Sequence, residues 1–213
     1  MKADATKNSL TLIADPIVTE PAEGNFFGLA VSPTAIYTSS QGSAAKGWIS
    51  TANRSQSDSL TNLSRHLAAT EAVGVSTPAS VTLTPHGYLI VSNIGELGEK
   101  RDSVAAFYEP ISKKMLMKLE LGLCDVCAIA YSPRRQMYAL DMAWGQPNGG
   151  LYRVIEDKSV PSGLRTKLIV KLPNPTSMCF DSDGALNVTL RGAVDDKGNS
   201  KGALVRIPSE ENL

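Results

Sequence analysis

The sequence predicts an all-β fold, a β-propeller of four-stranded antiparallel blades, with four blades recognisable in 213 residues. Three observations support this prediction. A hairpin-like segment recurs four times, a third apolar segment follows each copy, and breaker residues separate the apolar runs. Four antiparallel strands in a unit of roughly 40 to 50 residues are typical of a propeller blade.

The recurring hairpin is clearest at residues 77–93 (TPASVTLTPHGYLIVSN), where Val81 and Leu83 alternate with threonines before the turn residues Pro85-His86-Gly87. Related segments occupy residues 27–39, 127–141 and 175–190. The repeat spacing is about 50 residues, measured between Pro33, Pro85, Pro133 and Ser182. A near-constant period of this length favours a repeat protein.

Third strands are expected at residues 60–63, 104–107, 151–154 and 204–207, and fourth strands at 115–121 and 167–172. The first unit is the least regular, because Leu60, Leu63 and Leu67 also have helical spacing. An amphipathic helix over residues 59–70 is therefore an alternative to the strand. The strand is favoured because Asp58-Ser59-Leu60 falls where Asp102-Ser103-Val104 falls in the next unit.

We expect one propeller domain over residues 1–213, with units at about 25–74, 75–122, 123–172 and 173–207. The last unit stops after its third strand, whereas residues 10–14 form an apolar strand before the first hairpin. Pairing these two segments would close the ring and remove an exposed sheet edge. The sequence therefore predicts that the N-terminal strand 10–14 closes the last blade.

Charge and composition exclude some classes of function. The chain has 21 basic and 21 acidic residues and no Lys/Arg-rich run, so it lacks the signature of a nucleic-acid-binding protein. It also lacks an apolar run long enough to span a bilayer, and its N-terminus has no apolar core of a secretory signal. A cytoplasmic protein and a mature extracytoplasmic form both remain open. Three cysteines do not make a disulfide framework.

Long connections between the second and third strands indicate a working face. They are expected at residues 40–57, 94–101, 142–148 and 192–201, and in a propeller they emerge on one side. The residues expected to ring the mouth of the central channel and bind a ligand are Gln41, Asn93, Asp141 and Arg191, with Trp144 as a contact anchor. The alternative is that these are solvated loop residues without a ligand.

Other motifs are weaker. Cys124 and Cys127 have redox or zinc spacing, but no second pair or histidine completes a tetrahedral site. Cys127 and Cys179 fall in expected first strands and are interpreted as buried structural thiols. The segment 181–184 (DSDG) resembles the start of a calcium loop, but no acidic residue follows at the twelfth position, so it is interpreted as a turn.

The units resemble those of the NHL-repeat and senescence-marker-protein (gluconolactonase-like) superfamily of propellers, closest in style to the scytonemin-cluster propeller proteins. The resemblance rests on residues 78–96 with 102–110, 126–143 with 149–154, and 175–192 with 202–207, and covers most of residues 76–207. Such relatives usually have six blades, and four are recognisable in this sequence. A compact ring, a ring completed by oligomerisation and two further blades outside this sequence are all open.

The gluconolactonase branch of this superfamily implies a divalent metal at the channel mouth and hydrolysis of a sugar lactone. Its metal-binding Asn and Asp stand at the start of first strands, where this sequence has Cys127 and Thr176. A thiol and a lone hydroxyl replace a carboxylate or amide poorly for a hard cation. Asn93, Asp125 and Asp141 offer a different oxygen set that does not match the family motif.

Two functions follow as hypotheses. The first is a non-catalytic binding or scaffold propeller that presents its loop face to an unknown protein or small molecule and needs no cofactor. The second is a metal-assisted lactone or ester hydrolase, with calcium or zinc held by Asn93 and Asp141 and with Asp125 and Asp141 as catalytic groups. A homo-oligomer, including one that swaps the closing strand, is compatible with both.

Overall fold

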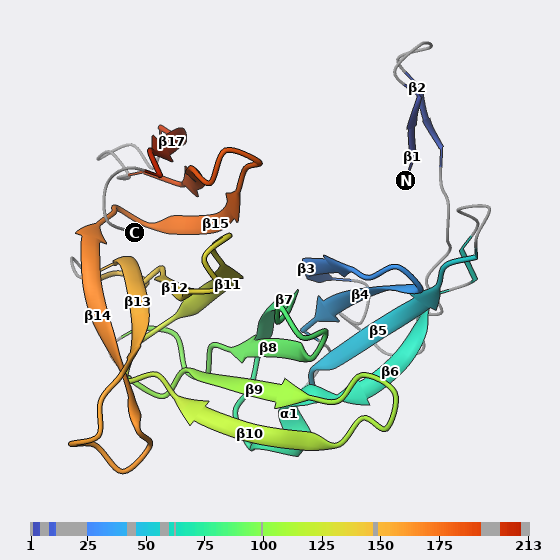
Figure 1. Ribbon diagram of the computed structural model, residues 1–213, viewed down its shortest axis with the longest axis horizontal. Coiled ribbons are helices and arrows are strands. Elements are labelled where there is room, and N and C mark those ends of the chain that lie inside the picture. Colours follow the sequence, from blue (N-terminus) through green and yellow to red (C-terminus); the bar gives the residue numbers. More distant parts are fainter. Residues whose placement is uncertain are drawn as a thin grey trace.

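The computed structural model describes residues 2–4, 9–11, 25–41, 46–55, 60–61, 63–98, 100–146, 149–192 and 201–209. Within this part, four antiparallel sheets stand side by side around a common centre as the blades of a β-propeller (Figure 1). Helix in the same part is limited to the short α1 (Ala69–Val73). The predicted all-β propeller is confirmed.

The blades are numbered in chain order. Blade 1 contains β3 (Phe26–Val31), β4 (Ala35–Ser40), β5 (Trp48–Asn53) and β6 (Ser64–Ala68), and blade 2 contains β7 (Pro78–Leu83), β8 (Leu89–Asn93), β9 (Val104–Tyr108) and β10 (Met115–Glu120). Blade 3 contains β11 (Val126–Tyr131), β12 (Met137–Asp141), β13 (Gly150–Glu156) and β14 (Leu164–Lys171). Blade 4 contains three described strands, β15 (Pro175–Phe180), β16 (Leu186–Leu190) and β17 (Ala203–Ile207).

The middle strands of the blades are buried on both faces, which explains their continuous apolar runs. Every residue of β8, β9 and β12 is buried. Neighbouring blades pack through three apolar cores. Leu89 and Tyr108 belong to the core between blades 1 and 2, Ile129 and Phe107 to the core between blades 2 and 3, and Leu151 and Val188 to the core between blades 3 and 4.

The ring is open between blade 4 and blade 1 (Figure 1). No buried core joins these two blades among the described residues. On the open side, Phe27, Leu29 and Val31 of β3 are 58%, 66% and 54% exposed. These side chains lack the neighbouring sheet that covers the corresponding strands of blades 2 and 3.

The closing strand expected at residues 10–14 is not formed where the structure describes it. β2 (Ser9–Thr11) pairs with β1 (Lys2–Asp4), with Leu10 opposite Ala3, and β17 has β16 as its one described neighbour. Residues 12–14 lie outside the described part. A local hairpin closes a far shorter loop than pairing with β17 would, so it loses less chain entropy.

The third strand of blade 1 also differs from the prediction. It is β5 (Trp48–Asn53), which lies inside the segment 40–57 that was expected to be a long loop, and residues 60–63 are not that strand. Serine and threonine in β5 weaken its alternation of apolar and polar residues. The repeat spacing therefore indicated residues 60–63 as the third strand instead. Of residues 59–70, Ser64–Ala68 form the fourth strand β6, and helix begins only at Ala69.

Chain direction places the functional connections at one end of the propeller. Because each blade is an antiparallel meander, the β4–β5, β8–β9, β12–β13 and β16–β17 connections emerge at the same end, together with the links between blades. We call this end the loop face. The tight turns between first and second strands lie at the opposite end, the turn face. In the described part, no helix is long and apolar enough to cross a membrane.

The inner strands of blades 1 and 2 approach very closely at Gly28. A Cβ built on Gly28 would lie 2.6 Å from the backbone nitrogen of Val81. The Gly28 amide donates to Ser39 Oγ, and Ser39 Oγ–H donates to the carbonyl oxygen of Ala79 on β7 at 2.7 Å. A glycine is therefore required for two backbones to meet here and for a buried hydroxyl to join the blades.

Replacing Gly28 by alanine is expected to destabilise the protein by about 1–3 kcal/mol, because the added methyl overpacks the contact between β3 and β7. Urea unfolding followed by circular dichroism measures the change. Gly202→Ala is the matched control, since a Cβ there would lie 3.4 Å from the Leu190 carbonyl oxygen, an ordinary contact. Equal effects of the two substitutions would contradict the close approach.

Candidate functional site

The innermost strands of all four blades, β3, β7, β11 and β15, line a central cavity of about 800 Å³. Its walls are largely apolar, with Phe27, Val81, Ile129 and Phe180 among the lining residues. The cavity reaches the loop face, where Ile94 and Met142 follow β8 and β12. Its size and its lining are those of a small-molecule site.

The polar groups of this channel cavity are neutral. Hydroxyls come from Ser80, Thr82, Tyr131, Thr176 and Ser177, and none of the described lining residues is an Asp, Glu, His, Lys or Arg. Burial, and then the negative charge of Asp141, raise the pKa of the Cys127 thiol. Burial also raises the pKa of the Tyr131 phenol. Both groups therefore stay protonated near neutral pH, and the cavity offers hydrogen bonds but no charge.

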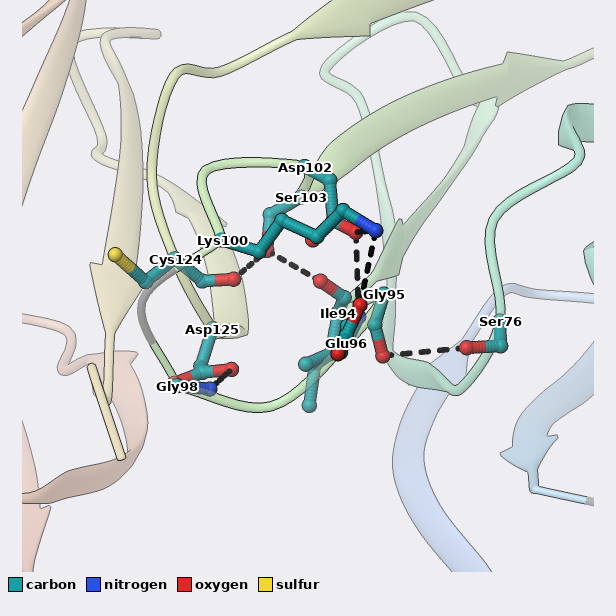
Figure 2. Close-up of polar contacts among 10 residues, drawn as sticks. All are labelled: Ser76, Ile94, Gly95, Glu96, Gly98, Lys100, Asp102, Ser103, Cys124 and Asp125. Atoms are coloured by element: carbon teal, nitrogen blue, oxygen red, sulfur yellow. Dashed lines mark hydrogen bonds and ion pairs between the residues drawn. The ribbon is translucent and has the colours of Figure 1, made fainter. Parts of the chain in front are cut away.

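A hydrogen-bond network holds the β8–β9 loop at the loop face (Figure 2). Ser103 is 1% exposed, and its Oγ lies 2.9 Å from the Ile94 carbonyl oxygen and 2.7 Å from the Cys124 carbonyl oxygen. The same oxygen accepts the backbone N–H of Val126 at 3.0 Å. Ser103 thus joins the loop of blade 2 to the entry of blade 3.

Two buried carboxylates hold the neighbouring loops. Asp141 is 2% exposed and accepts the backbone N–H groups of Cys124, Asp125 and Ala143 at 3.1, 2.8 and 3.0 Å. Asp125 is fully buried and accepts those of Gly98 and Trp144, at 3.2 and 2.5 Å. Because several oriented amides already satisfy these oxygens, both side chains act as loop anchors.

The pKa of Asp125 is raised, chiefly by burial and further by the negative charges of Asp141 and Asp102. The amides of Trp144 and Gly98 oppose this shift. The folded state therefore binds a proton at Asp125 more readily than the unfolded chain does. Ionised Asp125 costs stability at neutral pH, and that cost is relieved as the pH falls.

The structure separates the five predicted ligand-binding residues into two groups. Asn93 and Asp141 end β8 and β12 as expected, but they are 0% and 2% exposed, and the Asn93 amide donates to the Val75 carbonyl oxygen. Gln41 and Arg191 are exposed at the loop face. The Arg191 guanidinium lies 4.6 Å from the ring centre of Trp144, which is 43% exposed. Binding by these residues stays a prediction.

The divalent metal that the gluconolactonase resemblance implies does not fit this donor set. Asn93 has one buried oxygen without a hydrogen-bond partner in the described part, but both oxygens of Asp141 already accept amide hydrogens. No group of three or more His, Cys, Asp or Glu side chains comes together among the described residues. Calcium or zinc would need additional oxygen or nitrogen ligands here.

The thiols need one correction. Cys127 is half-buried and its Sγ–H lies 3.3 Å from the Leu140 carbonyl oxygen, but Cys179 is exposed, contrary to the prediction. Cys179 is exposed because no further blade covers that face of β15. The DSDG segment is a turn as predicted, since Asp181 accepts the backbone N–H groups of Asp183 and Ala185.

Sequence reasoning missed Ser103 and the lining of the channel cavity. The signal for Ser103 was present, because an Asp-Ser pair precedes β9 at residues 102–103, but it was used only to align the repeat. The cavity left no local signal, since its walls come from four strands far apart in the chain.

Asp141→Asn is expected to lower the free energy of unfolding by about 1–3 kcal/mol, because an amide nitrogen would face a backbone N–H that needs an acceptor. Thermal and urea unfolding test this change. Asp183→Asn, at an 82% exposed side chain, is the control and is expected to have little effect. A neutral result for Asp141→Asn would show that the anchoring bonds are dispensable.

The raised pKa of Asp125 predicts a pH-dependent difference between the wild-type protein and Asp125→Asn. The stability of the wild type relative to the variant is expected to increase as the pH falls from 7 through the folded pKa towards the ordinary value of 3.8. Urea unfolding of both proteins across this range measures the difference, in which the titrating groups that do not interact with Asp125 cancel. A difference that is flat or decreases towards low pH would contradict the shift.

No protein-family model matches the chain, and no curated protein matches it. Solved structures match its fold. The PQQ-bound aldose sugar dehydrogenase of Streptomyces coelicolor has a TM-score of 0.59 at 13% identity, over 93% of this chain and 63% of that chain. A gluconolactonase from Xanthomonas campestris has a TM-score of 0.52 at 14% identity, over 87% of this chain and 62% of that chain.

A third match is hydrazine synthase of Kuenenia stuttgartiensis, with a TM-score of 0.53 at 15% identity, over 89% of this chain and 51% of that chain. This chain therefore spans between about half and two thirds of the length of these three structures. Identities this low establish likeness of fold and not of activity. The chain is similar to propeller proteins that include a gluconolactonase.

Proposed function

We propose that this propeller is a non-catalytic binding module that holds an uncharged, largely apolar small molecule in its channel cavity. The observation that carries the proposal is the lining of the 800 Å³ cavity, where apolar side chains and hydroxyls converge without a charged group among the described residues. Such a lining favours burial of apolar surface and orients a ligand by neutral hydrogen bonds.

The carboxylates that hydrolysis would need are used elsewhere. Asp125 and Asp141 are not among the residues that line the cavity, and their oxygens accept the backbone amides that shape the loops. A general base must reach the substrate or its attacking water. This arrangement favours binding over metal-assisted lactone hydrolysis. A relationship to NHL-repeat or scytonemin-cluster proteins in particular also remains a proposal.

The loop face adds a second contact area to the proposed site. Trp144 is partly exposed and stacks with Arg191 from blade 4, so the pair presents a flat aromatic surface at the loop face. Aromatic side chains of this kind are common anchors in recognition sites. Contact of a ligand with Trp144 and Arg191 remains part of this proposal.

Titration with the neutral fluorescent probe N-phenyl naphthylamine tests the proposal. The wild type is expected to bind it, and Ser177→Trp is expected to weaken binding by about tenfold or more, because the indole projects into the cavity from an exposed lining position and takes up part of the ligand's space. Ser182→Trp is the control, since Ser182 lies in the exposed β15–β16 turn and not among the lining residues.

Equal probe affinity in the wild type and Ser177→Trp would contradict binding in the channel. The enzymatic alternative has its own assay, in which a panel of lactones is incubated with the protein and with calcium or zinc. Hydrolysis that is lost in Asp141→Ala, at unchanged fold by circular dichroism, would replace the binding proposal with the hydrolase hypothesis.

A further inference from the structure

A second cavity, of about 900 Å³, lies between blades 2 and 3 at the turn face. Its apolar residues come from both blades, with Phe107 and Met117 from blade 2 and Met137, Val154 and Leu164 from blade 3. Of the residues that line it, Tyr131 alone also lines the channel cavity. The interblade cavity is therefore a second site that adjoins the channel at Tyr131.

Positive charge is concentrated around this interblade cavity. Arg134, Arg135, Arg153 and Lys167 line it, against the single acid Glu156. In the whole chain, by contrast, 21 basic and 21 acidic residues balance. Four cations beside one acid leave an excess of positive charge, which favours an anionic occupant.

These cations are not neutralised by neighbouring acids. Among the described residues, the ion pairs join other side chains, and none of them includes Arg134, Arg135 or Lys167. The charge of these three side chains is therefore available to an anionic ligand.

Arg135 also has an unfavourable backbone conformation. Its φ of 62° is in the left-handed region, at the turn position where the repeat has Gly87 in blade 2 and Gly184 in blade 4, with φ of 85° and 80°. The three turns form the same backbone hydrogen bond, from Arg135 to Ser132, from Gly87 to Thr84 and from Gly184 to Asp181.

A side chain with a Cβ is disfavoured in this conformation, whereas glycine adopts it freely. Blade 3 therefore carries an arginine at a position where the fold itself favours glycine. Strain that the fold does not require is commonly found at sites of function. The side chain that causes the strain lines the cationic cavity, and this supports a role for Arg135 in binding.

We infer that the interblade cavity is a binding site for a small amphipathic anion, whose apolar body lies against Phe107, Met137 and Leu164 and whose acidic head pairs with Arg134 and Arg135. Charge complementarity selects the head, and the apolar floor selects an organic anion over a bare inorganic one. This site is independent of the proposed channel ligand.

A pair of probes with the same ring system distinguishes the two cavities, because the neutral probe reports on the channel cavity and the anionic probe on the interblade cavity. Anilinonaphthalene sulfonate is anionic, and N-phenyl naphthylamine is its neutral counterpart. The wild type is expected to bind the sulfonate in a salt-sensitive manner. The double substitution Arg134→Gln and Arg135→Gly is expected to weaken sulfonate binding by about tenfold and to leave the affinity for the neutral probe unchanged.

Arg135→Gly alone provides the sharper test, because it is expected to change binding and stability in opposite directions. It should weaken sulfonate binding by roughly two- to fivefold and raise the midpoint of thermal unfolding, since it removes the left-handed strain. Arg101→Gln, an exposed cation on the loop face, is the charge-matched control and should change neither property.

Four outcomes would overturn the inference. The first two are that the wild type does not bind the sulfonate and that the double variant binds it with unchanged affinity. The other two are that the double variant loses affinity for both probes equally and that Arg135→Gly has a lower unfolding midpoint. Loss of neutral-probe binding in Ser177→Trp with intact sulfonate binding would leave this inference standing. The tests of the two sites therefore fail independently.

Discussion

Close packing between the inner strands of neighbouring blades is the constraint on which the other features depend. Around the centre, β3 lies against β7 so tightly that Gly28 has no room for a Cβ, and a buried hydroxyl of Ser39 donates across to the Ala79 carbonyl oxygen. A similar link joins blades 3 and 4, where Cys127 Sγ lies 3.4 Å from the Pro175 carbonyl oxygen. These contacts fix both the width of the channel and the direction of the loops.

The two ends of the propeller use their polar residues differently. At the loop face, Ser103, Asp125 and Asp141 satisfy backbone groups and hold the connections in place. The channel inside is left with neutral walls. At the turn face the cations Arg134 and Arg135 have no acidic partner among the described residues, so their charge is available to a ligand. Buried carboxylates at one end and free cations at the other therefore imply different ligands.

The open side of the ring explains the exposed residues that a closed propeller would bury. At the opening, blade 1 presents Phe27 and Leu29, which also line the channel cavity, whereas blade 4 presents Cys179 and Arg206, the latter paired with Asp181 at 3.1 Å. One face is apolar and the other is largely polar. Among the described residues, these two sides do not form the kind of continuous apolar core that joins the other blades.

The sequence alone determined the hairpins, because alternating apolar residues and turn chemistry are local signals that survive in each repeat, as in 77–93 around Pro85. It failed at β5, where a Ser/Thr-rich strand gives no clear alternation. It placed Asn93 and Asp141 correctly at strand ends but could not show that both are buried, since burial depends on loops from other blades.

Only the tertiary structure decided where the sites lie. The channel cavity and the interblade cavity are each assembled from strands distant in the chain, so no local pattern marks them. The strain at Arg135 likewise becomes visible only once its φ is known beside those of Gly87 and Gly184. Periodicity is a property of neighbouring residues and can be read from the chain, whereas a cavity is a property of the packed blades and exists only when they meet.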